Sequence, residues 1–355
     1  MKNIRDKLRK YLEAMVKIPS LSGEERKIFC LCRDILTSSG FRVLLKEEKV
    51  PLYLHAYRGN SSLILSSHVD VFPLYNFPGG FILKGRKNLR GRGVLDAKGQ
   101  IAALFCALEM TSSPCQIVLT AREERTGEGS EKAKVEGEGC VVLEPTEFRI
   151  CIAQAGSVEF RAETKGITSH GSLPWKGKNA IEEALGFYTE IRNLVKTFPP
   201  HPLFPRGGWV NLGKIQGGWE PLIVPERCWM EVEVSFSPLV SLTRVKEKIE
   251  KLGEERKVSL KWEDFSYPYE IGKGEKIVRI LKNTYQKIKG EEPSLGGMEC
   301  WTDAENFFRK GIPAVVFGAG SLHLSHTERE KVYLEELVTL AEILRELIDL
   351  WNTTG

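Results

Sequence analysis

The chain has 355 residues, which suggests two domains at about 100–200 residues per domain. Its hydrophobic fraction of 42% is enough for a globular core, and 51 basic against 47 acidic residues leave a net charge of +4. The chain contains neither a dense run of Lys and Arg nor a long uncharged apolar window. These features argue against a nucleic-acid partner and against a membrane span.

Residues 1–18 are charged throughout and lack the apolar stretch of a signal peptide. Most of the eight cysteines lie inside apolar runs, as small buried hydrophobic residues do. Their spacing matches neither a zinc finger nor a redox motif, so reduced thiols are expected. We therefore expect a soluble, cytoplasmic protein.

The first part of the chain alternates strand and helix patterns. Ser22 and Glu25 have the spacing of a capping box at the start of a helix, and Gly40 lies where that helix should end. The predicted elements are a helix over 22–39, strands over 41–45, 62–66, 116–120 and 139–143, and a helix over 98–110. This alternation predicts an α/β fold with a largely parallel sheet.

The middle of the chain follows a different order. The patterns predict a strand over 157–164, a helix over 178–195, strands over 208–215 and 227–236, a helix over 242–252 and a strand over 257–262. This β-α-β-β-α-β order is that of a ferredoxin-like domain. After Pro268 the α/β pattern resumes, with helices over 275–288 and 334–351 and a strand over 314–317. We expect one α/β domain, residues 1–155 and 270–355, interrupted by an α+β domain over 156–269.

Polar residues capable of binding metal follow the predicted strands. His68 comes at the end of an apolar strand, where open α/β sheets place their sites. Asp70, two residues later, points to the same side and is placed to accept the second imidazole N–H. Asp96 lies just before a predicted helix, in a glycine-rich segment. A plain helix N-cap is the alternative role for this residue.

Further acids and a second histidine follow other strands. Glu123 and Glu124 are adjacent carboxylates, which repel each other unless cations share the charge. Glu144 ends a third apolar run, and His326 closes the glycine-rich segment after the strand over 314–317. Each signal alone is weak. Their convergence at strand ends indicates a two-metal hydrolytic centre.

Seven stretches carry a resemblance to a known family. They are SSHVD, GRGVLDAKG, REE, LEPT, KGITSHGSLPW, WTDAENFF and GAGSLHLSHTERE. In this order the chain resembles the M20 family of metallopeptidases and amidohydrolases, from about residue 10 to residue 345. The resemblance includes the inserted domain, which implies a lid and dimerisation domain.

The resemblance assigns the candidate metal ligands. His68 and Glu144 would bind one ion, and Glu124 and His326 the other, with Asp96 bridging the two. Two divalent ions are implied, with Zn favoured and Co or Mn as alternatives for carboxylate and imidazole ligands. His326 is preferred over His323 because the family has an acid four residues after its histidine.

The resemblance also implies catalytic roles. Glu123 would take a proton from the attacking water and pass it to the leaving amine. Asp70 would orient His68. His170 would stabilise the oxyanion from the neighbouring subunit of a homodimer, with a surface histidine as the alternative.

The leading function is hydrolysis of the amide bond of an N-acyl amino acid, with ornithine, lysine or diaminopimelate derivatives as candidates. Release of lysine or ornithine from an acidic carrier protein is a variant. A carboxypeptidase or dipeptidase acting on short peptides would use the same metal core. A non-catalytic metal-binding relative is a further alternative, but it would have no need of Glu123.

The inserted domain departs from the family pattern. Leu222 stands where many relatives have Asn, and Ser235 stands near the position of an Arg. Both family residues hold substrate, so the group that would bind a substrate carboxylate stays open among Arg161, Arg227 and a lysine. Residues 71–83 (VFPLYNFPGGFIL) are unusually apolar, and packing is favoured over pocket lining for them.

Overall fold

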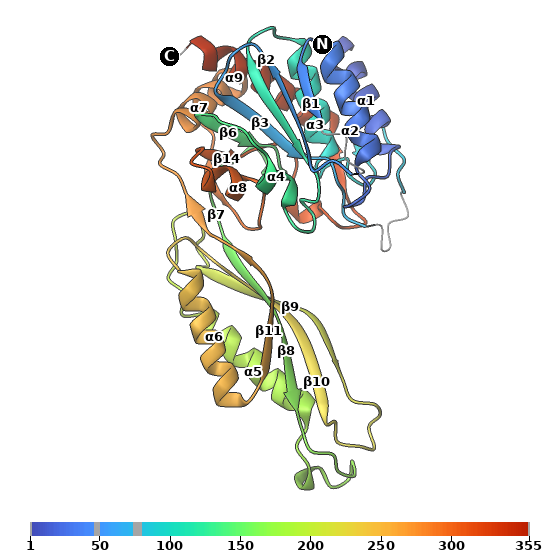
Figure 1. The fold of residues 1–355 in the computed structure, drawn as a ribbon, viewed down its shortest axis with the longest axis vertical. Helices are drawn as coiled ribbons and strands as arrows, with labels where there is room; N and C mark the ends of the chain where they lie inside the picture. Colours follow the sequence, from blue (N-terminus) through green and yellow to red (C-terminus); the bar gives the residue numbers. More distant parts are fainter. Residues whose placement is uncertain (1, 46–49, 74–79, 354–355) are drawn as a thin grey trace. The chain divides into compact units, whose positions relative to one another are not determined.

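The computed structural model describes residues 2–45, 50–73 and 80–353 (Figure 1). The chain divides into two compact units. The first comprises Met1–Ile152, Ile271–Gly296 and Thr302–Gly355, and the second comprises Ala153–Glu270 and Gly297–Trp301. Residues 74–79 of the apolar stretch over 71–83 lie outside the described residues.

The main sheet runs in the order β1-β2-β5-β3-β6-β14-β7-β12, with β13 also on β7. Its strands are β1 (Arg42–Leu45), β2 (Tyr53–Arg58), β3 (Leu63–His68), β5 (Cys115–Thr120), β6 (Gly139–Val142), β7 (Ile150–Gln154), β12 (Tyr269–Glu270), β13 (Leu295–Met298) and β14 (Ala314–Val316). The four central strands β5, β3, β6 and β14 are mutually parallel. The strands β1, β2, β7 and β12 pair antiparallel. The predicted α/β fold with a parallel centre is confirmed.

Helices bury this sheet. They are α1 (Lys2–Val16), α2 (Arg26–Ser38), α3 (Lys98–Glu109), α4 (Glu128–Lys132), α7 (Lys276–Lys289), α8 (Ala304–Arg309) and α9 (Leu334–Thr353). Helix α3 contacts both α1 and α9, while α8 contacts α4, β6 and β14. Every residue of β3 and β6 is buried, as expected for parallel strands covered on both faces. Among the described helices, none is both long and apolar enough to cross a membrane.

The second unit is a four-stranded sheet with two helices. Its elements are β8 (Gly156–Lys165), α5 (Ala180–Val195), β9 (Gly208–Gly217), β10 (Arg227–Phe236), α6 (Leu242–Arg256) and β11 (Ser259–Ser266). The strand order is β11-β8-β10-β9, and all pairs are antiparallel. Burial alternates along β8 and β10, because one face packs on α5 and α6. The predicted ferredoxin-like order is confirmed.

The predicted capping box at Ser22 and Glu25 is wrong. Helix α2 begins at Arg26, and neither side chain caps it in the predicted way. The Glu25 carboxylate instead accepts backbone N–H bonds from Gly23 at 2.9 Å and Arg122 at 3.1 Å. The Ser22 hydroxyl donates to Asp70 Oδ2 at 2.7 Å. Long-range contacts have replaced the local bonds, and they lead to the segments that carry the candidate site.

Candidate metal centre

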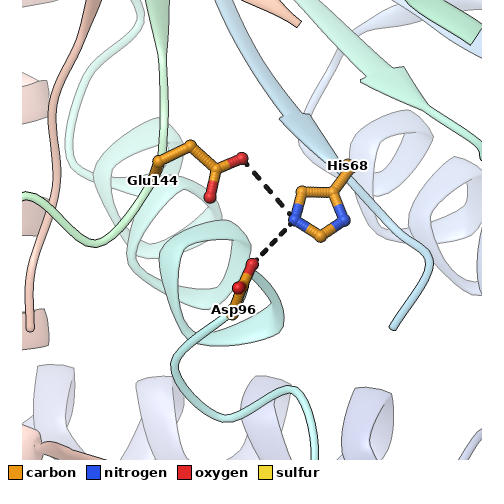
Figure 2. Close-up of side chains that lie close together, drawn as sticks. All are labelled: His68, Asp96 and Glu144. Atoms are coloured by element: carbon orange, nitrogen blue, oxygen red, sulfur yellow. Dashed lines mark hydrogen bonds and ion pairs between the residues drawn. The ribbon is translucent and has the colours of Figure 1, made fainter. Parts of the chain in front are cut away.

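Two neighbouring parallel strands, β3 and β6, place the first two candidate ligands. His68 is the last residue of β3, and Glu144 follows the end of β6, which pairs with β3. Because the carboxyl ends of parallel strands lie at one edge of the sheet, both side chains emerge there. They are only 1% and 4% exposed. His68 Nε2 lies 3.5 Å from Glu144 Oε1. Figure 2 shows that the carboxylates of Glu144 and Asp96 are both directed at this nitrogen.

Asp96 lies between the two histidines. Its Oδ1 atom is 2.9 Å from His68 Nε2, and its Oδ2 atom is 3.5 Å from His326 Nε2. The peptide bond between Asp96 and Ala97 is cis. Ala97, not Asp96, is the N-cap of α3, and none of the described side chains caps that helix. The N-cap role considered for Asp96 is therefore wrong, and its carboxylate faces the imidazoles instead.

His326 and Glu124 form the other side of the cluster. His326 Nε2 lies 2.9 Å from Glu124 Oε2. His326 adopts a left-handed backbone conformation with φ of 62°, which is uncommon for a residue other than glycine. Its side chain is 43% exposed, while that of Glu124 is buried. The second group is therefore more open to water than the first.

The five side chains form two groups that share one member. His68, Asp96 and Glu144 form one, and Asp96, Glu124 and His326 the other; within each, the candidate ligand atoms lie within 4.8 Å of one another. Ligand atoms of a tetrahedral site with bonds of about 2.0–2.2 Å lie roughly 3.3–3.6 Å apart, close to the contacts seen here. Within the part of the chain that the structure describes, the buried Glu144 Oε1 atom also has no hydrogen-bond donor. The residues present therefore fit two divalent ions.

Asp70 holds the first histidine and the loop of the acids together. Its Oδ1 atom lies 3.5 Å from His68 Nδ1, an ion-pair contact longer than an ordinary hydrogen bond. The same carboxylate accepts the backbone N–H of Glu123 and of Glu124, each at 3.1 Å. With the hydroxyl of Ser22 as a further donor, Asp70 fixes three separate segments at the site.

Glu123 lies beside the two ligand groups without belonging to either. Burial raises the pKa of Glu123 well above its usual value, and the charges of Glu144 and Glu124 raise it further against the opposing effect of His68. Burial likewise raises the pKa of Glu144. Crowded buried carboxylates of this kind are stabilised in their charged form by nearby cations.

A buried ion pair connects the segments of Asp96 and His326. Arg92 Nη1 lies 2.8 Å from Glu330 Oε2, and both side chains are almost fully buried. Glu330 Oε1 also accepts the backbone N–H of Leu95 at 3.2 Å, and Arg92 Nη2 donates to the backbone oxygen of His326 at 3.5 Å. The family pattern had pointed to Glu330 by its spacing alone, whereas the role of Arg92 was not predicted.

Asp303 supports the loop that carries Glu123 and Glu124, a role that was not predicted from the sequence. Its buried carboxylate accepts hydrogen bonds from the hydroxyls of Thr120, at the end of β5, and Ser130, in α4. Asn306 Nδ2 donates to Ser130 Oγ at 2.9 Å. The loop over 121–127 is therefore fixed at both of its ends. The signal in the sequence was the WTDA motif that contains Asp303.

Residues 64–350 match the profile of peptidase family M20/M25/M40. The chain belongs to this family. Acetylornithine deacetylase from Myxococcus xanthus is 30% identical over 315 residues, or 82% of this chain and 80% of the relative. A Staphylococcus aureus tripeptidase has a TM-score of 0.82 at 20% identity, with 99% of both chains covered. An M20 metallo-carboxypeptidase from Sulfolobus solfataricus has a TM-score of 0.80 at 17% identity, covering 98% of this chain and 100% of the other.

Family membership makes the chain a hydrolytic enzyme of the M20 type, whose members use divalent metal ions. The M20 resemblance seen in the sequence is thereby confirmed. The substrates in the relatives' names, an acylated amino acid and peptides, are small molecules. Between them these relatives include both deacetylases and peptidases.

The other histidines of this M20 enzyme stand apart from the two ligand groups of the described residues. His323 is exposed, and its Nδ1 atom lies 2.8 Å from Ser321 Oγ. His55 contacts Gln116 at 2.9 Å, and His201 contacts Glu270 at 3.0 Å. His170 belongs to the second unit, where it is exposed and its Nδ1 atom lies 2.7 Å from Ser172 Oγ.

The second unit of this M20 enzyme carries the positions that depart from the family pattern. Leu222 is 69% exposed, and its backbone oxygen accepts the N–H of Gly171, next to His170, at 2.7 Å. Ser235 is buried in β10. The guanidinium of Arg161 lies 3.9 Å from the centre of the Trp229 ring, and Arg227 is exposed.

Proposed function

We propose that this M20 enzyme hydrolyses the amide bond of an N-acyl amino acid with the aid of two divalent ions, Zn foremost, with Co and Mn as alternatives. His68 and Glu144 would hold one ion, Glu124 and His326 the other, and Asp96 both. The sharing of Asp96 by two ligand groups is the observation that carries this proposal.

Glu123 supplies the proton transfer in this mechanism. When bound, the two ions would polarise the scissile carbonyl and lower the pKa of the attacking water. Glu123 accepts the proton of that attacking water and delivers it to the leaving amine. The raised pKa of Glu123 suits a group that must both take up and release a proton. Asp70 holds His68 and the loop of Glu123 in position during this proton transfer.

The substrate is the finer part of the proposal. The likeness to acetylornithine deacetylase favours a free acylated basic amino acid. Release of an amino acid from an acidic carrier protein is a variant of this proposal that the net charge of +4 would suit. The tripeptidase and carboxypeptidase structures favour the second candidate, a peptidase that acts on short peptides with the same metal core. Because these structures share 20% identity or less with the chain, we place the deacylase first.

The inserted domain has its own part in the proposal. We assign residues 156–269 to a lid and dimerisation domain, and residues 1–155 and 270–355 to the catalytic domain. His170 would donate a hydrogen bond to the oxyanion in the active site of the neighbouring subunit. Its exposure leaves it accessible to a second chain. The cytoplasm is the proposed location, where the eight free cysteines stay reduced.

The test of the reaction is release of free amino acid from a substrate panel. The panel holds N-acetyl and N-succinyl derivatives of ornithine, lysine and diaminopimelate, dipeptides, tripeptides and a lysine-charged acidic carrier protein. Each substrate is assayed with added Zn, Co or Mn. We expect turnover of one acyl amino acid class, with kcat falling about 10²- to 10⁴-fold in Glu123→Ala at unchanged metal content.

Glu128→Ala is the matched control, because Glu128 follows the same loop but pairs with Arg122 at its surface. It should keep full activity. If only the peptides are hydrolysed, the enzyme is a peptidase and the deacylase assignment is wrong. Wild-type protein that binds two ions and turns over none of the panel would overturn both assignments.

The role of His170 is tested by mixing two inactive chains. Asp96→Ala lacks the metal centre, and His170→Ala lacks the oxyanion donor. If His170 acts in the neighbouring subunit, a co-expressed mixture contains heterodimers with one intact site, and about one quarter of wild-type activity returns. A mixture no more active than the separate variants would show that His170 does not act across a dimer.

A further inference from the structure

The ring of Phe72 lies flat against the imidazole of His326. Their centroids are 4.2 Å apart, and their planes differ by 13°. The terminal torsion of a histidine is broad, so an imidazole that is partly exposed rotates unless a neighbour restrains it. A parallel aromatic face at this distance restrains that rotation and covers one side of the ring.

The two histidines of the ligand groups are held in different ways. His68 is buried in the sheet edge, where Asp70 faces its second ring nitrogen. His326 is 43% exposed and lies on a segment outside the main sheet, with its backbone oxygen facing Arg92. The stack with Phe72 adds a contact on the face of the His326 ring to those that its Nε2 atom makes with Asp96 and Glu124.

Phe72 is itself well placed for this task. The backbone N–H of Val71 donates to Ser20 at 2.9 Å, and Leu21 pairs with Val71 in a parallel bridge. The hydroxyl of Ser20 donates to the backbone oxygen of Val69 at 2.7 Å. The segment that leaves β3 is thus fixed on both sides of Asp70, just before it reaches Phe72.

We propose that Phe72 is a positioning residue for His326, and so for the ion that Glu124 and His326 would hold. Phe72 keeps Nε2 of the imidazole directed at Asp96 and Glu124, where it lies 3.5 Å and 2.9 Å from their oxygens. This inference rests on the proposed two-metal centre. It extends that centre by an apolar residue from the stretch over 71–83, for which simple packing had been favoured.

The test is stepwise metal binding by chelator-treated protein. Co²⁺ is titrated into wild type and variants while the visible absorption of the bound ion is recorded, and Zn²⁺ binding is measured by calorimetry. Phe72→Ala removes the ring, Phe72→Leu keeps apolar bulk without a flat face, and Phe72→Tyr keeps the stack. We expect Phe72→Tyr to bind both ions, each with about the affinity that wild type has for it.

Phe72→Ala and Phe72→Leu should bind the first ion normally and the second about 10-fold more weakly, as is typical when a residue that orients a ligand is lost. Thermal unfolding of the metal-free proteins checks the fold, and Phe72→Leu carries the test if Phe72→Ala does not fold. If Phe72→Leu binds two ions with wild-type affinity, the inference about Phe72 is wrong but the two-metal centre stands. Fewer than two ions in wild type would overturn the two-metal centre and the inference with it.

Discussion

The Oδ1 atom of Asp70 accepts a hydrogen bond of 3.1 Å from the backbone N–H of Glu123. Its Oδ2 atom accepts the N–H of Glu124 and the hydroxyl of Ser22. One carboxylate therefore satisfies three donors from two distant segments. An amide at this position has a single oxygen, and its NH₂ group would face at least one of these donors.

We accordingly expect Asp70→Asn to lower kcat about 10- to 100-fold, the usual cost of losing a residue that orients metal ligands. KM should change little, because Asp70 does not face the substrate in the proposed mechanism. Steady-state kinetics on the preferred substrate provides the measurement, with the exposed Asp34→Asn as control. A kcat within twofold of wild type would contradict the orienting role.

Asp96 belongs to both ligand groups, whereas Glu144 belongs to one. Asp96→Ala should therefore weaken binding of both ions, and Glu144→Ala binding of one. Metal content after dialysis, measured by mass spectrometry, distinguishes these cases: we expect two ions in wild type, one in Glu144→Ala and fewer than one in Asp96→Ala. Equal metal content in the two variants would show that Asp96 does not bridge.

The ion pair between Arg92 and Glu330 is buried, so removing one partner leaves an uncompensated charge. Arg92→Met should lower the free energy of unfolding by about 3–5 kcal/mol. Lys17→Met, which breaks the exposed pair with Glu13, should change it by no more than about 0.5 kcal/mol. Urea denaturation of the metal-free proteins measures both. Similar losses in the two variants would show that burial adds nothing to the Arg92 pair.

Asp303 predicts a pH dependence of stability. Burial raises its pKa from 3.8 to about 6, against the opposing hydrogen bonds of Ser130 and Thr120. Between these two values the folded chain binds more protons at Asp303 than the unfolded chain, so its contribution to stability falls as the pH rises. At about 1.4 kcal/mol per pKa unit, the loss is about 3 kcal/mol.

Asp303→Asn lacks this titration. The free energy of unfolding of the metal-free wild type should therefore fall more between pH 3 and pH 7 than that of the variant, by about 3 kcal/mol. The Asp303 charge also raises the pKa of Glu123 and of Glu144, so its removal changes the titration of these two acids in the same direction and adds to the difference. Parallel curves for the two proteins would mean that Asp303 titrates normally in the folded state.

The fold and the strand-end members of the site could be predicted because their signals are local. An apolar run that ends in His68 or Glu144 reports both the strand and the edge at which it ends. The antiparallel strands β2 and β7 were missed. The burial of β2 is only partial, and β7 is a fully buried strand that continues into the long strand β8 after one residue.

The supporting residues could not be predicted because their partners are distant in sequence. Ser22 and Glu25 fit a capping box locally, yet they bind Asp70 and the backbone of Arg122. Asp303 meets Ser130 across 173 residues. The apolar side chain of Phe72 carried no sign that its ring would face an imidazole. Only the assembled chain brings these groups together.

The two ligand groups differ in how readily a bound ion would exchange with solvent. His68 and Glu144 leave neighbouring buried strands, so the first group needs little ordering. Glu124 and His326 come from segments outside the strands, and His326 is partly open to water. An ion at the second group would therefore meet solvent on the exposed side of His326, whereas an ion at the first would be enclosed. Both ions would stay bound in the wild type, but the second would exchange with ions in solution faster than the first.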